Sequence, residues 1–176
     1  KSNEHTGFPG TVSLSARTLR RLLLALAAHL RDLGFRHIAI LNTHGGNSPV
    51  IVYTLREIQA RLGLRAGMIA IPRAAELSAQ ETANGFHAGE WETALMLACA
   101  GKLVRMGRAV REHPAQIDAP GELRPGGAPA VFAWLTSDIS ASGVMGDAPA
   151  ATQKKGARWL EESSAALARR IEELLP

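Results

Sequence analysis

The chain has 176 residues, of which 46% are hydrophobic and 20% are charged, a balance typical of one ordinary globular domain. Its longest apolar run, Leu22 to Ala28, is too short to cross a membrane, and no apolar signal-peptide run follows Lys1. The net charge is +4, but the basic residues are scattered and not interleaved with aromatic residues, which argues against a nucleic-acid partner.

The first predicted elements are a helix and a short strand. Ser13 or Ser15 can cap a helix that runs to about Leu33, before Gly34. Its leucines recur at the spacing of one helical face: Leu19, Leu22, Leu23, Leu26 and Leu30. The apolar segment 37–42 predicts the strand.

A polar corner, residues 44–47, separates this strand from a second predicted helix. Asn47 or Ser48 can cap that helix, Pro49 suits its first position, and it ends near Leu62. Residues 65–71 predict a second strand. Helices alternating with strands predict a parallel α/β sheet, whose sites form at the carboxyl ends of the strands. His44 lies at such an end.

The second half is predicted to be less regular. A helix is expected from about Gly89 to Gly101, a long loop over 112–129, a short strand within 130–139, and a helix over 151–175. The buried side of that last helix is expected to carry Trp159, Leu160, Leu167, Ile171 and Leu174.

The His-Gly-Gly-Asn corner is the first candidate site. Gly45 and Gly46 let the backbone approach a ligand closely, and His44 can offer a ring nitrogen to a metal. Free amides at the start of the next helix can instead hold an anion. A plain turn with a hydrogen-bonded histidine explains the same residues, so all three interpretations stay open.

The second candidate is the segment His87 to Glu92. Helical spacing places Glu92 on one face with Leu95, Met96 and Cys99, so we expect a buried carboxylate paired with a cation or a metal. The alternatives are an ion pair for Glu92 and a capping role for His87. Glu90 is expected to be a surface acid, and Cys99 a buried, inert thiol.

No nucleophile-elbow, zincin, Walker or dinucleotide-binding motif occurs, and one cysteine excludes a cysteine-based zinc site. The remaining histidines and glutamates suit Zn²⁺ or Mn²⁺.

At these residues the chain resembles the creatininase (creatinine amidohydrolase) family. The resemblance lies in four blocks in the family's order, which together span nearly the whole chain: 2–11 (SNEHTGFPGT), 42–47 (NTHGGN), 87–93 (HAGEWET) and 142–156 (SGVMGDAPAATQKKG).

The resemblance implies a three-layer α/β/α fold with a mainly parallel sheet and a two-metal amidohydrolase site, holding two divalent ions (Zn, Mn or Fe) in the complete protein. By position, His44 and Glu92 match metal ligands, and His87 matches a proton-transfer group. The substrate-pocket residues implied are Ser2, His5, Gly45, Gly46, Asn47 and Trp91.

Two departures from the family pattern qualify these expectations. Family members carry an earlier segment with a Glu-x-His pair and an Asp, so residues 1–176 are expected to be a single creatininase-like domain without its N-terminal part. Creatininases proper also carry an aromatic residue and an acid where this chain has Gly45 and Gly46, which puts creatinine itself in doubt.

The sequence therefore predicts a metal-dependent hydrolase of a C–N bond in a small, non-peptide, possibly cyclic amide. A phosphate- or nucleotide-binding module and an inactive homologue are the alternatives. Family members commonly form homo-oligomers, and the low cysteine content fits a cytoplasmic protein.

Overall fold

The computed structural model describes residues 1–72, 76–114 and 133–174. The chain forms two compact units, Lys1–Ile71 and Pro72–Pro176, and each is described by itself. Unit 1 consists of α1 (Ala16–Asp32), β1 (His37–Asn42), α2 (Ser48–Leu62) and β2 (Arg65–Ala70). The α-helices and strands described in unit 2 are α3 (Ala79–Asn84), α4 (Glu90–Ala100), β3 (Arg111–Glu112), α5 (Thr136–Ile139), β4 (Gly146–Asp147) and α6 (Gln153–Leu174).

The strands and helices of unit 1 follow the sequence prediction closely. β1 and β2 pair in parallel, from His37 opposite Arg65 to Asn42 opposite Ala70. The side chain of Ser15 caps α1 by accepting the amide of Thr18. Gly63 ends α2 in the left-handed conformation, at φ +66°, which glycine adopts without strain.

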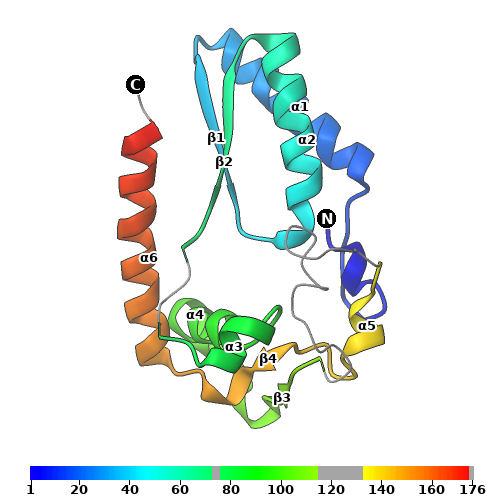
Figure 1. Cartoon of the computed structure of the whole chain (residues 1–176), viewed down its shortest axis with the longest axis vertical. Coiled ribbons are helices and arrows are strands. Elements are labelled where there is room, and N and C mark those ends of the chain that lie inside the picture. The colour runs from blue at the N-terminus through cyan, green and yellow to red at the C-terminus, as the bar shows by residue number, and fades with distance from the viewer. Residues whose placement is uncertain (73–75, 115–132, 175–176) are drawn as a thin grey trace. The chain divides into compact units, whose positions relative to one another are not determined.

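The core of unit 1 lies where its two helices meet the sheet. Ala27 of α1, Ile58 of α2 and Leu64 are buried and contact Ile38 of β1 and Ala66 of β2. Both helices lie on one side of the strands (Figure 1). Alternate residues of β1 are exposed, so the helices cover one face of this strand.

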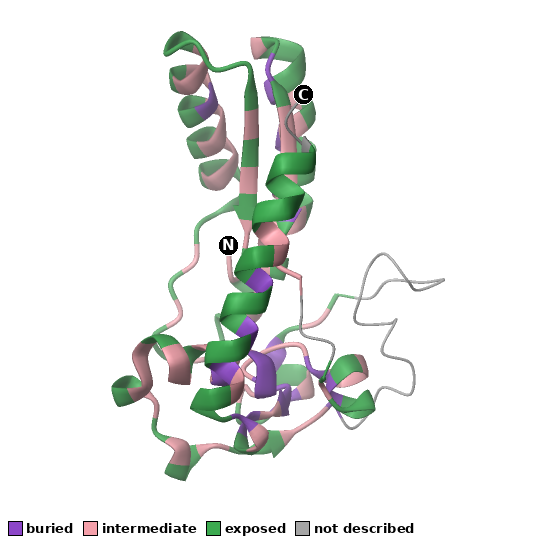
Figure 2. Cartoon of the chain, turned by 90° about the vertical axis from the view of Figure 1, so that its left-hand side faces the viewer, coloured by how far each residue is buried: buried purple, intermediate pink, exposed green. Residues whose placement is uncertain are grey.

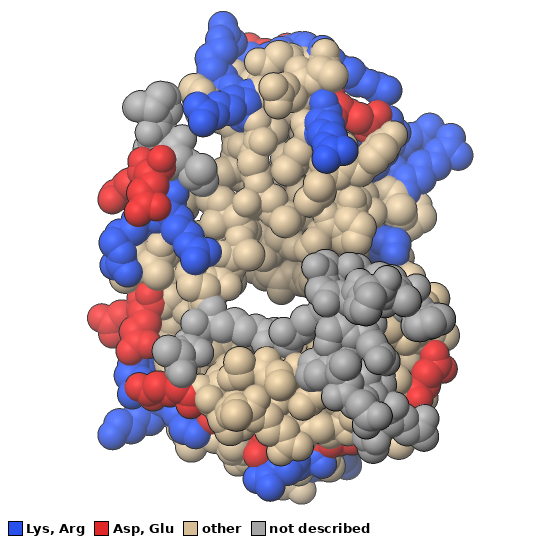
Figure 3. All heavy atoms as spheres, viewed as in Figure 1, with Lys and Arg blue, Asp and Glu red and all other residues tan. Residues whose placement is uncertain are grey.

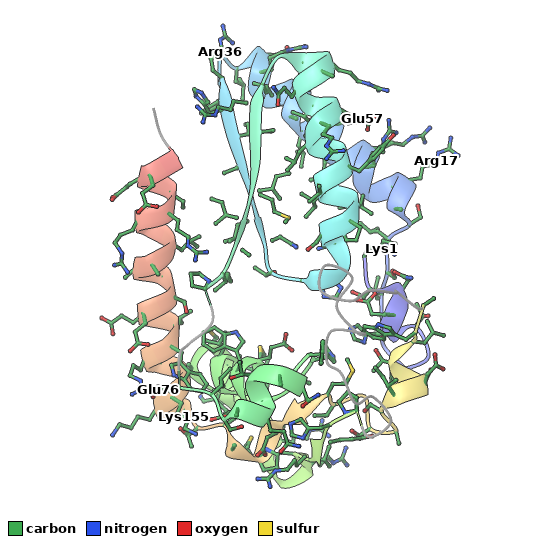
Figure 4. The ribbon with its side chains drawn as sticks, in the orientation of Figure 1. Lys1, Arg17, Arg36, Glu57, Glu76 and Lys155 are labelled. Atoms are coloured by element: carbon green, nitrogen blue, oxygen red, sulfur yellow. The ribbon has the colours of Figure 1, made fainter. Side chains whose placement is uncertain are left out.

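Charged side chains of unit 1 gather at its margin on the face drawn in Figure 3, and the centre of that face is uncharged. Between α1 and α2 the carboxylate of Glu57, labelled in Figure 4, pairs with the guanidinium of Arg20. This hydrogen bond lowers the pKa of Glu57 and raises that of Arg20. The pair therefore links the two helices from their solvent side.

Unit 2 is built around the contact between α4 and the first half of α6. Trp91 of α4 stacks on Trp159 of α6 with ring centroids 5.3 Å apart, and Trp159 is fully buried. Figure 2 shows that most of the surface of α6 is exposed. Leu160 and Ile171 are 41% and 42% exposed, so the prediction that they are buried was wrong.

Two further predictions for this half meet the structure only in part. The loop expected over 112–129 and the start of the strand expected over 130–139 fall mostly outside the described residues. The described end of that strand segment, Thr136–Ile139, is the short helix α5, so this part of the prediction was wrong. Across the described residues, no helix has the length and apolar content needed to span a membrane.

Candidate functional site

His44 in unit 1 directly follows β1, at the carboxyl end of the strand as expected. Its Nε2 lies 2.9 Å from Oε1 of Glu4 and 2.9 Å from the carbonyl oxygen of Lys1. Both of these atoms accept hydrogen bonds, so the contacts favour the tautomer with its proton on Nε2, which leaves Nδ1 as the nitrogen that can bind a ligand. The side chain is 30% exposed, so a ligand can reach it.

The opening segment folds against His44. The hydroxyl of Ser2 is 3.3 Å from the ring nitrogen Nε2, and the ring of His5 lies 6.0 Å from the His44 ring, centroid to centroid. The structure thus brings the predicted residues Ser2, His5 and His44 together. It adds Glu4, which the sequence analysis left out because its partner is a distant segment of the chain.

The two glycines of the corner differ in what surrounds them. A methyl group on Gly46 would stand 2.7 Å from Nε2 of His44 and would overlap the carboxylate of Glu4, whereas Gly45 faces open space. The missing side chain at Gly46 is what lets Glu4 reach His44. Asn47 fixes the turn, since its backbone N–H donates a hydrogen bond to the backbone carbonyl of His44 over 3.1 Å.

His87 and Glu92 of unit 2 form a second group at the start of α4. Nδ1 of His87 lies 3.5 Å from Oε2 of Glu92, and the two side chains are 39% and 44% exposed. The same Oε2 accepts the amide hydrogen of Ala88 over 2.6 Å. The hydroxyl of Thr93 donates to the carbonyl of Ala88. The predicted pair is therefore in contact and open to solvent.

The backbone between these two residues is strained. Ala88 has φ +52°, a left-handed conformation that costs a non-glycine residue about 1–3 kcal/mol. The preceding residue, His87, is held by an antiparallel bridge, in which the amide of buried Met145 donates to its carbonyl over 2.8 Å. Such strain persists only where the surroundings over-determine the conformation, so this corner is firmly built.

Two expectations about the carboxylates of α4 were wrong. Glu90 is 5% exposed and pairs with Nζ of Lys155 at 2.5 Å, so the buried, cation-paired acid is Glu90 (Lys155 is labelled in Figure 4). Glu92 is the half-exposed one. Cys99, expected to be buried, is exposed. The helix is rotated relative to the predicted face, because Trp91 and Ala94 carry the packing against α6.

A small hollow lies at this corner. Its volume is about 10 Å³, the space of about one water molecule, and its lining includes His87, Glu92 and Trp91. Trp91 is 8% exposed, so it contributes to the core of unit 2 as well as to this wall. The lining also includes Glu81, a nearly fully buried carboxylate that no sequence motif singles out.

The donor set suits a divalent metal in kind. A neutral imidazole nitrogen and a carboxylate oxygen are ligands that Zn²⁺ and Mn²⁺ accept. Among residues 1–72, 76–114 and 133–174, no three histidine, cysteine, aspartate or glutamate side chains are grouped tightly enough to hold an ion. His44 and Glu92 belong to different units, so the structure places each within its own unit only.

Comparison with known proteins decides the family. The family model for creatininase, described as creatinine amidohydrolase, matches residues 1–171. The chain belongs to the creatininase family. The α/β fold expected from the sequence is thereby confirmed, because solved creatininases share it: a mutant creatininase complexed with creatine aligns with 100% of this chain and 72% of its own, with a TM-score of 0.77 and 27% identity.

Two curated relatives of the chain differ in what they are named for. The mycofactocin precursor peptide peptidase of Mycobacterium ulcerans is 32% identical over 92% of this chain and 58% of its own length. The creatinine amidohydrolase of Pseudomonas putida is 29% identical over the whole chain and 70% of its own length. This chain thus spans 58% to 70% of the length of these two relatives. Other creatininase structures include a Zn–Zn form (TM-score 0.77, 26% identity) and a Mn form (TM-score 0.73, 26% identity).

Proposed function

We propose that this chain contributes to a metal-dependent amidohydrolase, which hydrolyses the C–N bond of an amide. The observation that carries the proposal is the contact between His87 and Glu92 on a strained, solvent-open corner. Exposed acid and base groups on a rigid corner suit proton transfer and ligand binding better than packing. The family match supports the same reaction class.

In this proposal His44 and Glu92 each hold a divalent ion, and the family's Zn–Zn and Mn structures support the choice of metal. The ions would polarise the amide carbonyl and acidify water. His44 would bind through Nδ1, because Nε2 is engaged by Glu4 and by the carbonyl of Lys1. A complete two-metal site needs further ligands besides His44 and Glu92, since no three candidate ligands are grouped among the described residues.

His87 is the proposed catalytic residue of the chain. Its Nδ1 faces Glu92, so the imidazole is oriented by a carboxylate in the way that fixes a proton donor. From this position His87 would give a proton to the leaving nitrogen as the C–N bond breaks. Ser2, His5, Gly45, Gly46, Asn47 and Trp91 are proposed to line the substrate pocket.

The substrate is proposed to be a small amide, with creatinine disfavoured. Gly46 carries no acid, and the carboxylate of Glu4 reaches into the space beside it. The relatives named for creatinine and for a precursor peptide leave both cyclic and peptide amides to be tested. Homo-oligomeric assembly and a cytoplasmic location stay predictions.

The test is metal content by elemental analysis, followed by ring opening of creatinine to creatine and by amine release from an N-formyl amine and a short peptide. We expect Glu92→Gln and His44→Gln to lose bound Zn²⁺ or Mn²⁺ and to slow hydrolysis at least 100-fold. His87→Asn should slow hydrolysis by about 10²–10⁴-fold while it retains the metal. Glu57→Gln, which removes the charge that pairs with Arg20 and Arg61 but touches neither candidate group, is the matched control.

A Glu92→Gln variant that keeps its metal and its activity would refute the proposal. Stabilisation by inorganic phosphate, together with indifference to a chelator, would instead favour the anion-binding interpretation of the His-Gly-Gly-Asn corner.

A further inference from the structure

Glu81, the third residue of α3, is a buried carboxylate that holds three segments of unit 2 together. It is 3% exposed. Its Oε1 accepts the amide hydrogen of Glu90 over 2.7 Å, and its Oε2 accepts that of Asp147 over 2.8 Å. Nε2 of His113 lies 3.3 Å from Oε2. A buried carboxylate is tolerated only with such donors, so these contacts are a condition of its burial.

Three glycines make room for this carboxylate. A methyl group on Gly146 would stand 2.8 Å and 3.0 Å from the two carboxylate oxygens and 2.6 Å from the Cα of Gly89. Methyl groups on Gly85 and Gly89 would likewise overlap the Glu81 carboxyl group. The backbone therefore closes around Glu81 at a distance that side chains at these positions would prevent.

The segment that Glu81 holds is the corner carrying His87 and Glu92. Glu90, whose amide binds Glu81, is the first residue of α4 and directly follows Gly89. Asp147, whose amide also binds Glu81, lies in β4, two residues after Met145, which forms the bridge with His87. Glu81 thus holds the chain after the strained residue Ala88 directly, and the chain before it through the segment that bridges His87. The amide of Ala88 in turn binds Oε2 of Glu92.

We propose that Glu81 is a positioning residue, which sets the placement of His87 and Glu92 without binding substrate or metal. Both of its oxygens are occupied by donors of the protein. The effect of Glu81 on catalysis and metal binding rests on the proposed function, because that proposal assigns these roles to His87 and Glu92. The effect of Glu81 on the placement of these two residues does not depend on the proposed function.

The carboxylate cannot be replaced by an amide of the same shape. Glutamine at position 81 would turn one oxygen into an NH₂ group, which would face a backbone N–H of either Glu90 or Asp147. One hydrogen bond would become a contact between two donors. Glu81→Gln therefore perturbs the corner with almost no change in side-chain volume.

The matched control is Glu112→Gln. Glu112 also accepts two backbone amides, from Ala141 over 2.7 Å and from Ser142 over 3.0 Å. These amides belong to a different loop. A general loss of loop anchoring should therefore appear in both variants, whereas loss of the corner should appear only in Glu81→Gln.

The experiment compares both variants with the wild-type chain by amide hydrogen exchange and by Zn²⁺ titration calorimetry. The exchange of the Ala88 amide reports directly on its bond to Glu92. In Glu81→Gln we expect this amide to exchange at least 10-fold faster and Zn²⁺ to bind about 10–100-fold more weakly, the usual effect of losing a group that orients a ligand. Glu112→Gln should change neither. If Glu81→Gln does not fold, His113→Phe keeps an aromatic ring but removes the side-chain donor to Oε2, and it should shift both readouts a few-fold in the same direction.

The outcomes separate this inference from the proposed function. Unchanged exchange of Ala88 and unchanged Zn²⁺ affinity in Glu81→Gln would overturn the positioning role. Faster exchange in both Glu81→Gln and Glu112→Gln would also overturn it, since it would show general loosening. If Zn²⁺ does not bind even when the further ligands of the site are supplied, the proposed function fails, and the exchange of Ala88 alone decides whether Glu81 places Glu92.

Discussion

Replacement of Gly156 by alanine tests how closely α4 and α6 approach one another. Gly156 is buried in the interior of α6, where glycine is intrinsically unfavourable by about 1 kcal/mol relative to alanine. A methyl group there would overlap the carbonyl group of Ala94 in α4 and stand 3.1 Å from the amide nitrogen of Leu95. Helix propensity therefore predicts stabilisation, and packing predicts the opposite.

The packing effect should win. A methyl carbon and a carbonyl oxygen rest about 3.3 Å apart or more, so the overlap with Ala94 would force α6 to retreat by about 1.5 Å. A gap of that size forfeits about half or more of the dispersion energy of the facing atoms, including those of the Trp91–Trp159 stack. Overpacking costs about 3 kcal/mol at the upper end of its range. Subtracting about 1 kcal/mol of helix propensity leaves a net loss of about 2 kcal/mol.

Thermal and urea unfolding followed by circular dichroism would measure this loss. At roughly 2–4 °C per kcal/mol for a chain of this size, the midpoint should fall by about 4–8 °C. The control is Gly101→Ala, at the end of α4, whose methyl group would meet nothing within 4 Å and should change the midpoint little. A Gly156→Ala variant as stable as the wild-type chain would show that the two helices do not touch at this residue.

Three further measurements test other parts of the structure. Lys155→Met should destabilise unit 2 by about 1–3 kcal/mol in urea unfolding, because it leaves Glu90 buried without a cation, and adding Glu90→Leu should recover most of the loss. The pKa of Glu112 is lowered, chiefly by the hydrogen bond from the side chain of Ser142. The ionised carboxylate therefore stabilises the fold above the ordinary pKa of glutamate, and this contribution is lost as the pH falls below about 4. Glu112→Gln should therefore flatten the acid branch of the stability–pH curve, and an unchanged branch would contradict the assignment. Ile58→Ala, at a fully buried position, should cost about 2–5 kcal/mol in the same unfolding assay.

The elements of unit 1 were predictable because local signals determine them. The Ser15 cap, Pro49 at the start of α2 and Gly63 at its end each act within one turn of helix. The parallel pairing of β1 and β2 follows from a strand–helix–strand order with short connections. None of these inferences needs knowledge of which distant residues meet.

Unit 2 was harder to predict because its order depends on long-range contacts. The α4–α6 contact is permitted by Gly156, more than fifty residues beyond the carbonyl group that its methyl would strike. The burial of Leu160 and Ile171 was expected from helical spacing, but only the first half of α6 carries the stripe of buried residues Gly156, Trp159 and Ser163. The spacing of apolar residues predicts which face of a helix is buried. How far along the helix that face is covered depends on the length of the element packed against it, here α4.

The two carboxylates of α4 show the same limit at the candidate site. Glu90 and Glu92 are two residues apart near the start of a mostly apolar helix, so periodicity alone had to choose one as buried. The choice is made by Lys155, which supplies the cation that a buried carboxylate requires, and it falls on Glu90. Glu92 is thereby left at the surface beside His87, with its carboxylate bonded to a single backbone amide among the described residues. Had Glu92 been the buried partner of a lysine, its charge would already be compensated and it would be a poor metal ligand. The error about which acid is buried therefore strengthens the case that Glu92 is available for metal.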